Sequence, residues 1–145
     1  MKGILIDPTA KTVTDIEVES WEKVKEIIGC KWLEGVTIAR VAAHAEQIHA
    51  EQILVNEEGL LVDEPGPFFQ VGDNTPIAGK GVVLGVDYEG DTVSTRLTAA
   101  LVAPRISFPD VEFTGFTTTE DDPIHPLLGP MHRITRTANF KPRGA

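Results

Sequence analysis

The sequence has little of four things that would narrow its function at once: cysteine, positive charge, aromatic residues and long apolar runs. Among its 145 residues Cys30 is the single cysteine, so no disulfide can form within the chain. A lone thiol is typical of a reducing compartment, and we expect a cytoplasmic protein. The opening apolar run, residues 4–6 before Asp7-Pro8, is too short for a secretion signal or a membrane span, and we expect no membrane partner.

The charge balance argues against direct binding to nucleic acid. Asp and Glu number 22 against 13 Lys and Arg, which gives a formal net charge of −9. Such a chain repels the phosphates of DNA, RNA and anionic lipid. Asp15, Glu17 and Glu19 alternate along a predicted strand at steps of about 7 Å, close to the spacing of phosphates on one DNA strand. This acidic face fits either DNA mimicry or the solvated side of an edge strand.

The pattern of apolar residues predicts an α+β domain over residues 1–108. We expect a curved, mostly antiparallel sheet packed on one main helix at about residues 20–29, where Ser20 suits an N-cap and Gly29 a left-handed C-cap. Trp21 and Trp32 are expected to anchor the core. Alternating or continuous apolar runs predict strands at residues 3–6, 13–18, 32–41, 52–55, 59–62, 68–71, 82–86 and 92–94. We expect a hairpin from 3–6 with 13–18 and another from 52–55 with 59–62.

From about Pro109 the composition changes. A Thr and acid run is followed by recurrent prolines and a basic end, with isolated apolar residues between them. We expect residues 109–145 to form an extended arm that packs on its own domain or on a neighbouring subunit. From the sequence we therefore hypothesise that the chain forms homo-oligomers through residues 110–145.

Residues 65–94 hold the glycine-rich loop around which we expect the chain to be organised. Candidate residues for binding a ligand or partner are Phe68, Phe69, Asp73, Asn74, Gly79, Lys80 and Gly81. The loop lacks the spacing of a phosphate-binding loop, and a strand rather than a helix follows it, which favours structural glycines. Adjacent residues of a strand point to opposite faces, so we expect one of the two phenylalanines to be exposed beside Asp73 and Lys80.

No motif for catalysis or metal binding stands out. The four histidines, His44, His49, His125 and His132, lack metal-ligand spacing, and we expect no metal and no cofactor. Adjacent acids at 57–58, 63–64 and 121–122 are typical of solvated turns, and Cys30 fits a small residue after the helix. We therefore expect a protein without catalytic residues.

Short motifs link the chain to a known family. They are Asn56-Glu57-Glu58-Gly59-Leu60-Leu61, Gly66-Pro67-Phe68-Phe69 and the run from Ile77 to Gly85, together with the opening strand and the helix end at Ile28-Gly29-Cys30. In these the chain resembles, over about residues 1–108, the phage, plasmid and bacterial proteins called domain of unknown function 3846. The resemblance implies no activity or catalytic residue.

The resemblance does imply a relation to small accessory proteins of phage and mobile elements, which commonly bind and inactivate a component of the host. The leading hypothesis is a non-catalytic accessory protein that occupies a host macromolecule, for example a defence protein. One alternative is capture of a nucleotide-like signal molecule at residues 72–81, between neighbouring chains. Another is a small hydrolase that uses acids and histidines.

Overall fold

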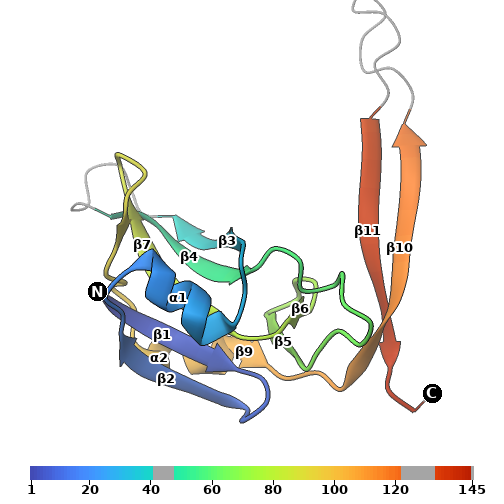
Figure 1. Ribbon diagram of the computed structural model, residues 1–145, viewed down its shortest axis with the longest axis horizontal. Helices are drawn as coiled ribbons and strands as arrows, with labels where there is room; N and C mark the ends of the chain where they lie inside the picture. Colours follow the sequence, from blue (N-terminus) through green and yellow to red (C-terminus); the bar gives the residue numbers. More distant parts are fainter. Residues whose placement is uncertain (41–47, 122–132, 145) are drawn as a thin grey trace, which may run out of the picture. The chain divides into compact units, whose positions relative to one another are not determined.

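The computed structural model describes residues 1–40, 48–121 and 133–144 (Figure 1). Contacts within the chain divide it into two compact units, Met1–Pro109 and Asp110–Ala145. Every strand pairing in the described residues is antiparallel. The predicted class, a mostly antiparallel sheet with few helices, is therefore confirmed.

Unit 1 holds nine strands, two α-helices and a short 3₁₀ helix in its described residues. They are β1 Lys2–Asp7, β2 Thr12–Glu17, α1 Trp21–Ile28, β3 Leu33–Arg40, β4 Ile48–Asn56, β5 Phe68–Val71, β6 Ile77–Ala78, β7 Gly81–Asp87, β8 Thr92–Val93, α2 Ala99–Val102, η1 Ala103–Arg105 and β9 Ile106–Ser107.

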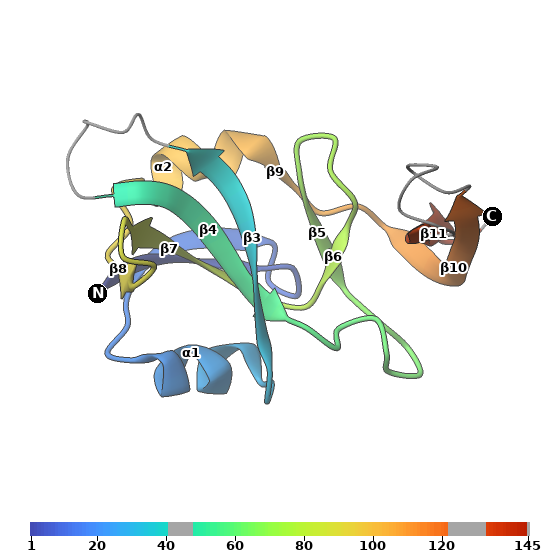
Figure 2. The ribbon, with the colours of Figure 1, turned by 90° about the horizontal axis from the view of Figure 1, so that it is seen from above.

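The main sheet is built around β7. Its strand order is β2-β1-β7-β4-β3, and β8 also pairs with β7. Strand β4 pairs with residues 82–87 of β7 along one edge. On the other edge of β7, β1 pairs with its first half and β8 with its second half. The backbone N–H of Thr95 donates to the carbonyl of Lys2 at 2.9 Å, which joins the segment after β8 to β1. One bulge in the β3–β4 pairing, between Thr37 and Ala39, accompanies the bend of these strands in Figure 2.

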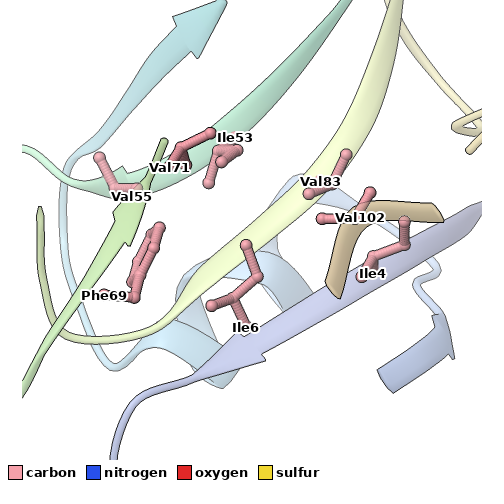
Figure 3. Packing of buried hydrophobic residues seen from close by; sticks show 8 residues of the cluster. All are labelled: Ile4, Ile6, Ile53, Val55, Phe69, Val71, Val83 and Val102. Carbon is pink, nitrogen blue, oxygen red and sulfur yellow. The ribbon is translucent and has the colours of Figure 1, made fainter. Parts of the chain in front are cut away.

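Both faces of this sheet are covered, which explains the unbroken apolar run of β7. Val82 and Leu84 point to the face that carries α1, where they pack with Val24 of the helix. Val83 points to the opposite face, over which Val102 of α2 lies (Figure 3). Figure 2 shows α1 and α2 on opposite sides of the sheet. A strand covered on both faces has no polar side, so its sequence does not alternate.

Helix α1 begins and ends where its caps predict. The Ser20 side chain accepts a hydrogen bond from the backbone N–H of Lys23, and Gly29 takes the left-handed conformation with φ of 78°. The helix has only eight residues and covers part of one face. The second face is covered by α2 together with β5 and β9, a layer that the predicted single main helix did not include.

Two predictions for this unit are wrong. Residues 59–62 form no strand, because the Asn56 side chain and backbone close a turn that runs into an exposed loop where Leu61 is 64% exposed. The tryptophans are not core anchors either: Trp32 is 54% and Trp21 40% exposed. The Trp21 indole N–H instead donates to the Thr92 hydroxyl at 2.8 Å.

Unit 2 is a β-hairpin in its described residues. Strand β10, Val111–Asp121, pairs with β11, Arg133–Pro142, in an antiparallel register that places Phe113 opposite Phe140. A bulge between Phe113 and Gly115 shifts this register, and Gly115 has φ of 117°, which favours glycine. The segment expected to be an extended arm is thus a two-stranded ribbon.

Candidate functional site

The glycine-rich loop is a tight connection between β5 and β6, and three backbone donors of residues 72–79 are already used. The N–H of Gly72 donates to the carbonyl of Arg105, that of Asn74 to Val71 and that of Gly79 to Pro67, all at 2.9–3.0 Å. A phosphate cradle needs free N–H groups that converge on one point. These three groups bind carbonyl oxygens of the protein instead.

Both phenylalanines beside the loop are core residues. Phe68 is 2% exposed and Phe69 is fully buried, so the expectation that one of them lies on the surface is wrong. Phe69 belongs to the core cluster on the second face of the sheet, together with Ile53 and Val55. Asp73 and Asn74 are exposed and Lys80 is half-buried, and neither aromatic ring joins them on a common surface.

Two glycines of this region have structural roles. Gly79 has φ of 83°, a conformation that other residues rarely adopt. Gly81 lies against the core, where an added Cβ would come within 2.7 Å of Ile53 Cγ2 and 2.8 Å of Phe69 Cζ. Strand β7 can approach β4 and β5 this closely only because Gly81 has no side chain.

Asp15 of the predicted acidic face is exposed and also makes a hydrogen bond within the fold. In the β1–β2 register Asp15 lies opposite Ile4, on the face of the sheet that carries α2. Its Oδ1 accepts a hydrogen bond from the backbone N–H of Ala99 at 2.9 Å, at the start of that helix. Glu17 and Glu19 are exposed. Strand β2 is an edge of the sheet, where acids discourage pairing with other chains.

The histidines cannot be placed, because the side chains of His44, His49, His125 and His132 lie outside the described residues. In the described part of the chain, one acidic group has metal-ligand geometry: oxygens of Asp87, Glu89 and Asp91 lie within 4.8 Å of one another. Asp87 Oδ1 already accepts hydrogen bonds from the N–H groups of Glu89 and Asp91. The β7–β8 turn accounts for this cluster without an ion.

A buried carboxyl group that the sequence analysis did not single out lies in β4. Glu51 is 2% exposed; its Oε2 accepts from the Thr95 hydroxyl at 2.6 Å and its Oε1 from the Arg96 N–H at 2.9 Å. Thr95 Oγ1 accepts in turn from the Leu97 N–H at 3.1 Å. This network attaches residues 95–97, which lead into α2, to strand β4. Glu51 lies two residues before Ile53, so a strand places both side chains on the same face. An acid at such a core position was the signal that could have revealed this network.

The single thiol is not set up as a nucleophile. Burial raises the pKa of Cys30, and the opposing effects of the nearby Lys25 charge and the Trp32 backbone are smaller. A raised pKa lowers the thiolate fraction at neutral pH, and the thiolate is the reactive form.

A pocket opens on the second face of the sheet, between the strands and α2. Its volume is about 60 Å³, and all its lining side chains except Arg105 are apolar: Ile38, Ile53, Val71, Leu97, Leu101, Val102, Arg105 and Ile106. Leu101 is 63% exposed and Arg105 is also exposed. The pocket therefore offers an apolar recess with one cationic side chain in its wall.

Residues 1–103 match the family described as Domain of unknown function (DUF3846). The chain belongs to this family. The DUF3846 match includes β1 to α2 and ends within η1, so it covers most of unit 1 and none of unit 2. No curated protein and no solved structure matches the chain. Among the described residues, no helix has the length and apolar character needed to span a membrane.

Proposed function

We propose that this DUF3846 protein is a non-catalytic accessory protein, of phage or mobile-element type, that acts in the cytoplasm by occupying a host protein. The single observation that carries the proposal is the apolar pocket beside α2. Together with the exposed Leu101, it is a place where a partner's side chain can be buried.

The composition of the pocket suggests the chemistry of the partner. A volume of about 60 Å³ suits one short aliphatic side chain. Arg105 supplies a cation in a chain whose net charge is −9, and it would favour an acidic group beside that side chain. Buried anchors in pockets dominate the free energy of many protein interfaces. We therefore expect a partner segment with an aliphatic residue next to Asp, Glu or a terminal carboxylate.

The geometry gives less support to the alternatives. Capture of a nucleotide-like molecule needs donors at residues 72–81, where three backbone N–H groups bind carbonyl oxygens instead. A hydrolase needs a reactive acid or thiol in a recess. Glu51 is enclosed by its own hydrogen bonds, and Cys30 has a raised pKa.

The proposal can be tested by using the immobilised protein to capture partners from a bacterial lysate. Two variants with the same Leu→Asp substitution at different positions are compared with the wild type. Leu101→Asp places a charge at the pocket, whereas Leu61→Asp makes the same change at a leucine of equal exposure that does not line it. We expect a protein that is retained by the wild type and by Leu61→Asp and lost with Leu101→Asp. Titration of the purified partner should then show binding at least about tenfold weaker for Leu101→Asp.

Two results would overturn the proposal. One is equal capture by all three proteins, which would place the contact elsewhere. The other is a cyclic nucleotide or ADP-ribose compound that shifts the melting temperature of the wild type but not of Lys80→Ala. Recovery of that compound intact would indicate capture of a small molecule, and recovery of a cleaved product would indicate an enzyme.

A further inference from the structure

Strand β3 is an edge of the main sheet. In the described residues it pairs with β4 alone, at the end of the strand order (Figure 1). One residue before β3, the Trp32 carbonyl accepts a hydrogen bond at 3.0 Å from the N–H of Glu57, one residue after β4. This contact is the first step of the ladder between the two strands, and it determines which residues of β3 bond to β4.

Bonded residues alternate along an antiparallel ladder. Counting from this contact, Glu34 and Val36 direct their backbone groups to β4. Leu33, Gly35 and Thr37 direct theirs away from it, and the bulge after Thr37 ends the regular stretch. These three residues have no further backbone partner in the part of the chain that the structure describes. Their N–H and C=O groups therefore form an open row.

The two outer strands of the sheet differ in charge. Strand β2, at the other edge, carries Asp15 and Glu17, and acids at an edge discourage pairing with another chain. Strand β3 has no charged residue from Gly35 to Ala39. Trp32, directly before β3, is 54% exposed, and aromatic residues are enriched in protein interfaces. The edge of β3 is therefore open to a further strand, whereas acids guard the edge of β2.

The open edge lies beside the pocket described above. Val36 and Ile38 pack against the core on the second face of the sheet, and Ile38, which sits in the bulge, lines the pocket. Bulges at sheet edges commonly re-aim a side chain in this way. A strand added to β3 places every second side chain on that same face. One of these side chains then stands next to Ile38, at the wall of the pocket.

We propose that the partner binds as an extended segment that adds a strand to the edge of β3. The inference rests on the function proposed above and specifies the conformation of the bound segment. Backbone hydrogen bonds to Leu33, Gly35 and Thr37 hold the segment, and its alternate side chains provide the specificity. The added strand is antiparallel, as is every other strand pairing of the described residues.

The side chains of β3 indicate the sequence of the segment. Glu34 is exposed and favours a basic residue opposite it, and Val36 favours a β-branched one. Opposite Ile38, an aliphatic residue with an acidic neighbour suits the apolar pocket and Arg105. A second copy of this chain is the less suitable occupant, because each copy carries a net charge of −9 and like charges repel.

A designed peptide is the probe for this site. Acetyl-Asp-Leu-Thr-Val-Thr-Lys-Thr-amide places leucine opposite Ile38, valine opposite Val36 and lysine opposite Glu34 in an antiparallel pairing. Titrated into the isotope-labelled full chain, it should shift the NMR signals of β3 with a Kd of about 1 mM or lower. A peptide of the same composition in scrambled order should bind at least about fivefold more weakly, because its side chains no longer alternate.

N-methylation of the peptide gives a matched control. Methyl groups on the two threonines that flank valine block N–H groups that point to β3, and they should weaken binding at least about tenfold. Methyl groups on valine and lysine block N–H groups that point away from β3, and binding should stay within about threefold.

Amide hydrogen exchange locates the new hydrogen bonds. In the peptide complex the N–H groups of Leu33, Gly35 and Thr37 should exchange severalfold more slowly than in the free protein. Those of Glu34 and Val36 already donate to β4 and should change little. This measurement distinguishes a strand at the edge from a peptide that fills the pocket alone.

Four results would overturn the strand addition. They are no binding at about 5 mM peptide, equal weakening by both methylated peptides, unchanged exchange of the three outward N–H groups, and a stable dimer of the free protein that pairs through β3. The last would assign the edge to a second copy of the chain.

Failure of this inference can be told apart from failure of the proposed function. Thr37→Pro removes one outward N–H, a change that an edge strand tolerates, and it should abolish capture of the host protein. A host protein lost with Leu101→Asp but retained by Thr37→Pro would leave the pocket and exclude the added strand. Peptide binding with all the expected controls, but no host protein that depends on Leu101, would leave the strand site and exclude the proposed function.

Discussion

Removing the Glu51 carboxyl group should destabilise unit 1, although Glu51 itself does not line the proposed pocket. Glu51→Ala takes away the acceptor of the Thr95 hydroxyl and of the Arg96 N–H. Glu51 is 2% and Thr95 7% exposed, so water does not readily replace the lost partner. The stretch that leads from β8 into α2 loses its attachment to β4.

The magnitude follows from the two groups left without an acceptor. A buried donor that loses its acceptor costs about 1–3 kcal/mol, so the pair costs about 2–6 kcal/mol. Burying the carboxyl group carries a desolvation cost of its own, which its removal returns in part, and we expect a net loss of about 3 kcal/mol in the free energy of unfolding. For a unit of this size that is about 12 °C in Tm.

Urea unfolding followed by far-UV circular dichroism measures the loss. Glu51→Gln keeps an oxygen for the Arg96 N–H and should lose only about 1–2 kcal/mol. Gln52→Ala, the next residue on the other strand face, is the matched control and should lose less than about 1 kcal/mol. If Glu51→Ala falls in that same range, the network does not hold the segment and our account of it is wrong.

Three further predictions test the local structure. Gly81→Ala should lower the free energy of unfolding by about 2 kcal/mol in the same urea assay, because the added Cβ would meet Ile53 in a packed core. The control Gly35→Ala would meet only the flexible end of the Gln52 side chain and should lower it by less than about 0.5 kcal/mol. Alkylation of Cys30 at pH 8 should be slower than that of a cysteine in an unstructured peptide, because its raised pKa leaves less thiolate; an equal rate in the folded protein would contradict the burial. Ser20→Ala should lower stability by about 1 kcal/mol and Ser20→Gly by a few tenths, and equal losses would exclude capping by the hydroxyl group.

Local signals in the sequence were sufficient to predict those features that depend on the chemistry of one or a few neighbouring residues. Ser20 and Gly29 predicted both ends of α1, because a cap depends on a hydroxyl group and on a left-handed residue at two positions. The first hairpin followed from alternation over residues 13–18. Short motifs were enough to indicate the family to which the chain belongs.

The expected exposure of one phenylalanine was wrong because distant segments decide what is exposed. Nothing near Phe68 or Phe69 in the sequence says that β5 packs on the second face of the sheet, so one of the two rings was expected at a surface, whereas both are buried. Asp15, although exposed, accepts a hydrogen bond from the N–H of Ala99 at the start of α2. Predicting either outcome required the topology.

By itself, then, the sequence determined the antiparallel class, the helix ends, the opening hairpin and the family, since each depends on neighbouring residues or on short motifs. The tertiary structure decided which side chains meet. Glu51 reaches Thr95 across 44 positions of the chain, and the pocket collects residues from position 38 to position 106. Which surfaces a protein offers to a partner depends on such distant contacts, because burial is a property of the folded chain and not of any one segment.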